Sequence, residues 1–203
     1  MKSRILVFRK RCARAGGFSL TELVVAIAVA LVLMAIGMPN FLRAYHAYQL
    51  TNAAQKFSDI LRLTRYDAIR LNKNVNCVIK PDAVDPTRTD VFADENGDTL
   101  PGPLEKIILL DNGGNLVDSG GVPGTAALLA AANVTGGNVT PAPGNATITF
   151  DSRGAVNPAT AVNVFYLASP NSTEAGFRAV LLMPAGSIQM WSGDASGTWR
   201  HIR

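Results

Sequence analysis

The densest set of candidate ligands for a hard cation is an acidic segment in the middle of the chain. Its four candidates are Asp94, Asn96, Asp98 and Glu105. Counted from Asp94 they occupy positions one, three, five and twelve, which is the spacing of the EF-hand calcium loop. Thr99 departs from that pattern, because the sixth position of the loop is normally glycine, and two prolines also interrupt the segment. The residues therefore predict either a calcium site or an acidic polar turn, and both interpretations stay open.

The residues that could act as a catalytic base or nucleophile stand outside any catalytic motif. They are the histidines His46 and His201 and the cysteines Cys12 and Cys77. No zinc-binding spacing or nucleophile elbow surrounds them, and the glycine-rich stretch 113–124 lacks the lysine and hydroxyl of a phosphate-binding loop. We therefore expect no enzymatic activity and, apart from calcium, no cofactor.

Cations and an aromatic residue gather at the C-terminus. Arg200 and Arg203 are candidates for contacts with DNA phosphates, whereas the alternative is a C-terminal strand with Trp199 packed on a sheet. The chain has 19 Lys+Arg and 15 Asp+Glu, but six of the basic residues fall within residues 1–17. The remainder has 13 basic and 15 acidic residues, so its charge does not favour nucleic acid as a partner.

The chain begins with a basic leader followed by an apolar segment. Residues 18–38 are 21 residues long, or about 31 Å as a helix, which matches the core of a bilayer. The small residues Gly16 and Gly17 precede the apolar run instead of following it, unlike the cleavage site of a secretory signal. Because the basic residues keep the leader in the cytoplasm, the rest of the chain is expected on the other side of the membrane.

Glu22 is the ionisable residue of this segment. A charged side chain at the centre of a membrane helix costs about 2.5 to 3.5 kcal/mol, so it needs a partner. Cleavage between Gly17 and Phe18 would create an α-amino group about one helical turn from this carboxylate, in the same chain or in a parallel neighbour. The sequence therefore predicts that Glu22 takes part in subunit assembly. The alternative is a single-pass signal anchor with Glu22 at the interface.

The residues GGFSLTELV, which start at Gly16, resemble the class III signal of type IV pilins and type II secretion pseudopilins. In that family a prepilin peptidase cuts after the glycine and methylates the new N-terminal phenylalanine. The resemblance implies that Gly17 and Phe18 form the processing site and that Glu22 pairs with a neighbouring N-terminus. It also implies a single-pass location in the inner membrane, with the head outside the cytoplasm, before the chain enters a pilus or pseudopilus. The implied partners are other pilins, the prepilin peptidase and the inner-membrane assembly platform.

A second helical segment, residues 39–72, is amphipathic. Apolar residues recur every three or four positions from Leu50 to Leu71, and Pro39 predicts a kink or local unwinding before them. From residue 73 to 203 the pattern changes to short β-like runs separated by turn residues. The sequence therefore predicts an α+β fold in which a long N-terminal helix packs on an antiparallel β-sheet head, as in pilins. The expected strands are residues 75–79, 90–93, 106–110, 147–150, 162–167, 177–182 and 188–191.

Two hairpin turns and one loop complete the predicted head. Asp151–Gly154 and Pro184–Ser187 have the composition of hairpin turns. Residues 112–145 are rich in Gly, Asn, Thr and Pro, which predicts a long surface loop with a short helix over residues 125–132.

Residues 145–191 resemble, more loosely, the C-terminal half of the GspH/FimT type of minor pilins. This resemblance implies a minor pilin or pseudopilin of a type II secretion pseudopilus or type IV pilus. The alternatives are a major pilin, or a DNA-uptake minor pilin that binds DNA through Arg200 and Arg203.

Overall fold

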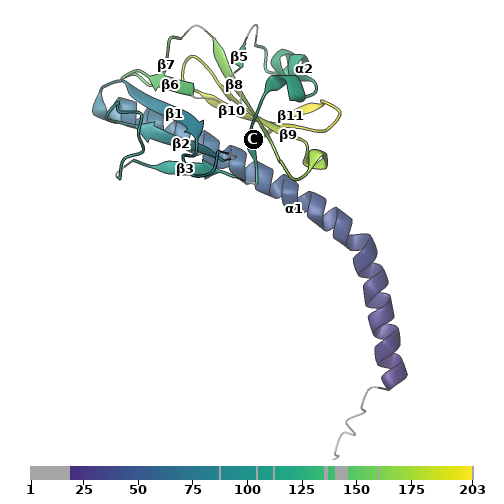
Figure 1. Cartoon of the computed structure of the whole chain (residues 1–203). Helices are drawn as coiled ribbons and strands as arrows, with labels where there is room; N and C mark the ends of the chain where they lie inside the picture. The colour runs from purple at the N-terminus through teal and green to yellow at the C-terminus, as the bar shows by residue number, and fades with distance from the viewer. Residues whose placement is uncertain are drawn as a thin grey trace, which may run out of the picture. The chain divides into compact units, whose positions relative to one another are not determined.

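The computed structural model describes residues 19–86, 88–103, 105–111, 113–134, 146–159 and 161–202, and the backbone of 137–139 (Figure 1). The chain divides into two compact units, with the boundary after Asn40, and each is described by itself.

The first unit contains the apolar beginning of α1, a helix that runs from Leu20 to Leu71. The side chains of residues 20–40 are all exposed, including those of Leu23 and Ile36. By length and composition, α1 is the one helix in the described part of the chain that could cross a membrane. The helix continues through Pro39 without local unwinding, which was one of the two alternatives expected at this proline.

In the second unit, α1 buries the stripe that its periodicity predicted. Leu50, Phe57 and Leu61 are fully buried, as are most other apolar residues of the stripe. The helix ends one residue before the predicted end, because Asn72 adopts a left-handed conformation with φ 50°. The Lys73 amide then donates to the carbonyl of Ala68, and the Asn72 amide donates to that of Ile69. This is the Schellman arrangement that ends many helices.

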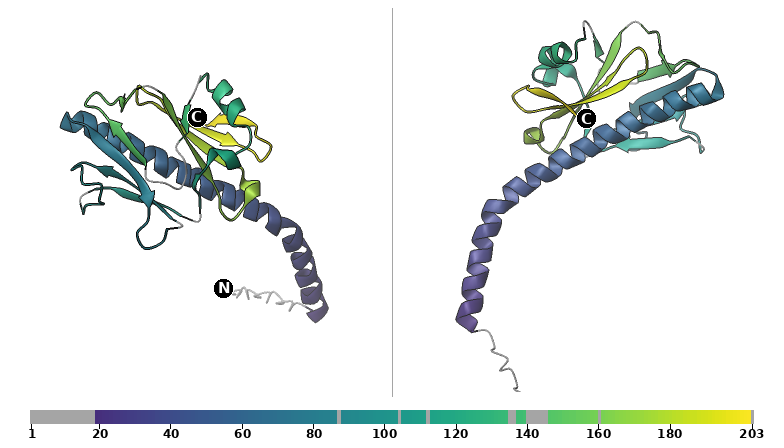
Figure 2. Two further views of the ribbon diagram at one scale, coloured as in Figure 1. Left: turned by 45° about the horizontal axis from the view of Figure 1, so that its top comes forward. Right: turned by 180° about the vertical axis from the view of Figure 1, so that it is seen from behind.

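The head contains two sheets in place of the single sheet that we expected (Figures 1 and 2). The first has the strand order β3-β2-β1-β6-β7, and the second has the order β11-β10-β9-β8-β4. These neighbours are all antiparallel, whereas β5 pairs in parallel with β8. The bounds are β1 Val75–Pro81, β2 Thr89–Asp94, β3 Ile107–Leu110, β4 Asn115–Val117, β5 Gly137–Val139, β6 Ala146–Phe150, β7 Val156–Asn157, β8 Val162–Ala168, β9 Phe177–Leu182, β10 Ile188–Gly193 and β11 Trp199–Ile202.

Two hydrophobic clusters stabilise the head. In the larger one, the buried stripe of α1 packs against residues of both sheets, and the rings of Phe57 and Phe165 meet edge to face with centroids 4.9 Å apart. The smaller one lies on the second sheet, which has six strands when β5 is included. It surrounds Tyr166 and Trp199 and includes Leu128 of α2 (Thr125–Ala131). The structure therefore confirms the α+β class and the packing of the long helix on antiparallel strands.

The segment expected to be a long loop is largely ordered in its described part, which corrects that expectation. It contains β4, the 3-10 turn η1 (Ser119–Gly121), α2 and β5. Leu128 is fully buried and Val122 is 6% exposed, because the aliphatic residues of this segment form part of the smaller cluster. The predicted short helix is confirmed as α2. Both predicted hairpin turns are also found, between β6 and β7 and between β9 and β10.

Candidate functional site

The predicted processing site lies at the edge of the described structure. Gly17 and Phe18 lie outside the described residues. Glu22 is exposed in the first turn of α1, where the helix dipole favours a negative charge. Ser19 and Thr21 share a hydrogen bond of 2.8 Å between their hydroxyls just before it. The carboxylate of Glu22 is thus accessible to a group outside its own chain.

The acidic candidates form a cluster next to the C-terminal end of α1. One carboxylate oxygen each from Asp94, Asp98 and Glu105 lie within 4.8 Å of one another. Asp94 is 1% exposed, and its two oxygens accept the amides of Gly97 at 2.6 Å and Thr99 at 3.2 Å. Arg70 from α1 lies 3.6 Å from a carboxylate oxygen of Glu95 in the same turn, which fixes the cluster against the helix.

The remaining oxygens of the cluster also accept hydrogen bonds. Glu105 accepts the amides of Glu95 at 3.2 Å and Gly102 at 2.8 Å. Asp98 accepts the Leu100 amide at 2.8 Å and the Asn96 side-chain amide at 2.9 Å. Asn96 therefore binds Asp98 instead of turning its amide oxygen toward the carboxylates. These bonds support the acidic turn, because each of these carboxylate oxygens has an N–H donor within the chain.

The C-terminal candidates Trp199 and Arg200 differ in their exposure to solvent. Trp199 is 8% exposed, its indole N–H donates to the Pro123 carbonyl at 3.3 Å, and its ring lies 6.0 Å from that of Tyr166. The interpretation of a C-terminal strand with a packed Trp199 is therefore correct. Arg200 points from β11 as an exposed side chain, whereas Arg203 lies outside the described residues.

Sequence analysis missed Arg178, a buried arginine on β9. Its side chain is 7% exposed, and burial lowers its pKa from the ordinary value. The guanidinium donates to the Thr51 hydroxyl at 3.1 Å and to the Ala47 carbonyl at 3.4 Å, both on α1, and to the Phe177 carbonyl at 2.8 Å. The signal in the sequence was a single cation within an otherwise apolar strand, which is a costly place for a charge.

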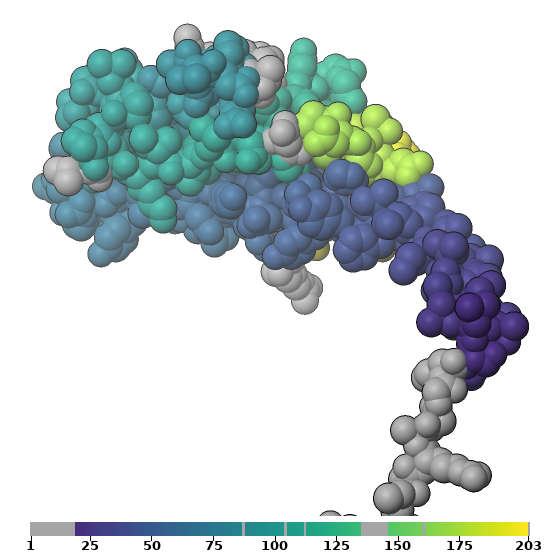
Figure 3. All heavy atoms as spheres, turned by 60° about the horizontal axis from the view of Figure 1, so that its bottom comes forward, coloured from purple at the N-terminus to yellow at the C-terminus, as the bar shows by residue number. Residues whose placement is uncertain are grey.

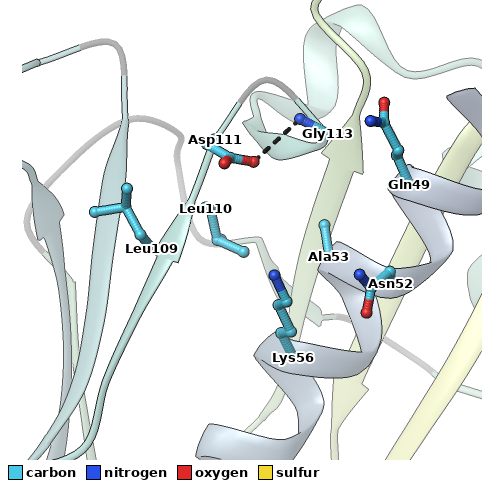
Figure 4. A pocket seen from close by; sticks show the side chains of 8 residues that line it. All are labelled: Gln49, Asn52, Ala53, Lys56, Leu109, Leu110, Asp111 and Gly113. Carbon is cyan, nitrogen blue, oxygen red and sulfur yellow. Dashed lines mark hydrogen bonds between the residues drawn. The ribbon is translucent and has the colours of Figure 1, made fainter.

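A hollow of about 260 Å³ lies between α1 and the end of β3 (Figure 4). Gln49, Asn52 and Lys56 reach it from the helix, and Asp111 and Gly113 form its opposite side. The Asp111 carboxylate accepts the Gly113 amide at 3.2 Å. The described residues that line this hollow include no histidine, cysteine or hydroxyl group.

Comparison with known protein families gives two matches to this chain. Residues 53–186 match the profile of GspH, described as a type II transport protein. Residues 12–38 match the prokaryotic N-terminal methylation motif. No curated protein matches the chain. These two matches include most of the head and the segment that carries Gly17, Phe18 and Glu22.

Two solved structures are similar to this chain, and both are crystal forms of the type IV minor pilin FimU from Pseudomonas aeruginosa. The first is 15% identical with a TM-score of 0.46 and covers 75% of this chain and 93% of that chain. The second is 16% identical with a TM-score of 0.45 and covers 74% of this chain and 97% of that chain.

Proposed function

The chain belongs to the GspH family of type II transport proteins and is a minor pilin or pseudopilin subunit, and we propose that its N-terminal segment directs both its processing and its assembly. The observation that carries this proposal is the methylation motif over residues 12–38, which continues into the exposed apolar part of α1. Subunits of this family are structural, and they assemble with other pilins in a filament. The apolar helix fits a membrane-anchored pilin.

In the proposed processing step, a prepilin peptidase cuts after Gly17 and methylates the new amino group of Phe18. The basic leader holds residues 1–17 in the cytoplasm, and residues 18–38 span the inner membrane. The head, from residue 73 to 203, then lies outside the cytoplasm. The assembly platform of the inner membrane receives the processed subunit.

In the proposed assembly step, the apolar beginning of α1 exchanges lipid for the helices of neighbouring pilins. Its exposed leucines, valines and isoleucines support this step, because such a surface is stable only against lipid or other apolar side chains. Glu22 then pairs with the amino group of a neighbouring Phe18. An ion pair shielded from water is sensitive to geometry, so it sets the register between neighbouring subunits.

Two measurements test this proposal. Mass spectrometry of the mature chain should show an N-terminal methylated phenylalanine at position 18. Glu22→Ala should leave insertion and cleavage intact but prevent incorporation into filaments, whereas Ser19→Ala, in the same segment, should be incorporated normally. A mature chain that begins elsewhere would refute the processing step, and normal incorporation of Glu22→Ala would refute the charge pair.

The major-pilin alternative differs in abundance. A major subunit forms most of the protein in sheared filaments, whereas a minor subunit is present in few copies. Quantitative immunoblotting of sheared filaments should therefore find this chain at a small fraction of the main subunit.

A further inference from the structure

Arg178 is a cation buried in the head, at 7% exposure. Among the described residues, no carboxylate oxygen lies within the 4.0 Å that defines an ion pair to its guanidinium. Its three acceptors, on Thr51, Ala47 and Phe177, are all neutral. Desolvation of an unpaired charge costs several kcal/mol, and a guanidinium has five N–H donors to satisfy. The arginine can thus accommodate an anion that its own chain does not supply.

A second arginine stands on the same face of the sheet. Arg178 on β9 is opposite Ser192 on β10, and Ser192 is opposite Arg200 on β11. Directly opposed residues of antiparallel strands share a face, and each step across the sheet is about 5 Å. The two arginine Cα atoms are therefore about 10 Å apart, with a serine hydroxyl between them.

Both arginines line one hollow of about 290 Å³, which we call the arginine hollow. Six residues with charged or hydroxyl side chains line it: Glu174, Arg178, Ser192, Asp194, Thr198 and Arg200. Glu174 belongs to the 3-10 turn η2 (Thr173–Ala175) and forms an ion pair with Arg43 of α1. In Figure 3 the yellow-green segment that contains η2 lies directly against the blue helix. The ion pair between Glu174 and Arg43 thus attaches one side of the hollow to α1.

The two acids of the hollow already have partners. Glu174 binds Arg43, while one oxygen of Asp194 accepts the Ser196 hydroxyl and the amides of Ser196 and Thr198. The hydroxyl of Ser196 and the amide of Thr198 lower the pKa of Asp194. The carboxylate of Asp194 therefore stays ionised, and among the described residues neither acid forms an ion pair with Arg178.

We propose that the arginine hollow binds a carboxylate side chain from a neighbouring pilin subunit in the filament. This proposal rests on the proposed function. A guanidinium fork matches a carboxylate, and Ser192 and Thr198 provide hydroxyl donors beside it. The fixed acids at the rim repel the repeated charges of a nucleic acid, whereas a single carboxylate can approach the two arginines between them.

The partner's acid can be trapped chemically. Arg200→Lys keeps the positive charge but introduces an amine, which a water-soluble carbodiimide couples to a contacting carboxylate. Filaments or membranes from cells that produce the full chain are treated with the carbodiimide, and crosslinked peptides are identified by mass spectrometry. Arg153→Lys is the matched control, because Arg153 is an exposed arginine on the turn between β6 and β7.

We expect a crosslink from position 200 to an Asp or Glu of another pilin chain, and none from position 153. We also expect Arg200→Gln to lower incorporation into filaments at least about tenfold relative to Arg153→Gln, as truncation of a charge pair at an interface does. Coupling of position 200 only to Asp194 or Glu174, or equal yields from both positions, overturns the proposal. The proposal is also overturned if the full chain shifts a labelled DNA duplex at low salt and this shift depends on Arg200. If the unsubstituted chain is absent from filaments, the proposed function itself fails. This outcome is distinct from a failure of the crosslink at position 200 in filaments that contain the chain.

Discussion

Arg65 of α1 donates a hydrogen bond of 2.9 Å from its Nε to the carbonyl oxygen of Gly154, in the turn between β6 and β7. The turn between β9 and β10 closes on the same point, because the amide of Val156 donates to the Pro184 carbonyl at 2.9 Å. A residue of the helix and two hairpin turns, one from each sheet, therefore meet where Gly154 and Gly186 approach each other.

Gly186→Ala is expected to destabilise the head at this meeting point. Gly186 has a φ of 78°, and a Cβ there would overlap the carbonyl oxygen of Gly154 and lie 2.8 Å from Nε of Arg65. We expect the free energy of unfolding to fall by at least about 2 kcal/mol. Urea unfolding of the full chain in detergent micelles measures this change. Gly120→Ala is the control, since nothing lies within 4 Å of its Cβ, and an equal effect of both variants would contradict the prediction.

Arg178→Met is expected to separate stability from assembly. Methionine keeps an apolar stem of similar length and removes a cation that has no counterion among the described residues, so we expect the free energy of unfolding to change by less than about 1 kcal/mol. The same substitution should reduce filament incorporation, because the hollow loses its buried charge. A large loss of stability in urea unfolding would instead show that Arg178 mainly joins β9 to α1.

Asp94→Ala is expected to lower the free energy of unfolding by about 1 to 3 kcal/mol. The substitution leaves the amides of Gly97 and Thr99 without their acceptor in a partly buried turn. Asp98→Ala should cost less, because Asp98 is exposed and water can replace it. Both values come from urea unfolding, and equal costs would contradict the assignment of Asp94 as the main acceptor of the turn.

Calcium is expected to leave the unfolding temperature unchanged, because each oxygen of Asp94, Asp98 and Glu105 already accepts an N–H donor. Thermal unfolding at increasing calcium concentration checks this. A midpoint that rises with concentration, and does so less in Glu105→Gln, would restore the calcium interpretation.

Cys77 is expected to resist thiol reagents in the folded chain. It is fully buried, and burial raises the pKa of its thiol from 9.0 to about 12, against a smaller opposite effect of a hydrogen bond from Thr64. A maleimide should label the mature chain at pH 8 only after unfolding, and rapid labelling of the native chain would show that the strand opens locally.

The same shift predicts how Cys77 couples stability to pH. Between about pH 9 and pH 12 the unfolded thiol ionises while the folded one stays protonated, so the folded state loses stability as the pH rises. Cys77→Ala should show a smaller alkaline loss than the unsubstituted chain in parallel urea titrations. Identical losses would assign the effect to lysine and tyrosine residues.

Local periodicity was enough to predict most elements. The apolar segment from residue 18 to 38 was predicted from its apolar composition and length, and the stripe from Leu50 to Leu71 from residues three or four positions apart. Strand β9 was predicted with its observed bounds. Strand β4 was not predicted, because three residues between turns carry too little alternation to be distinguished from a loop.

The sequence by itself determined the N-terminal methylation motif, the apolar helix and the α+β class, because these depend on which residues are neighbours along the chain. Only the tertiary structure decided that Arg178 is buried opposite Ser192, in line with Arg200, and that each carboxylate oxygen of Asp94, Asp98 and Glu105 accepts a hydrogen bond. Strand register and helix packing set these relationships. Arg178 and Thr51 are 127 residues apart, so no local pattern connects them.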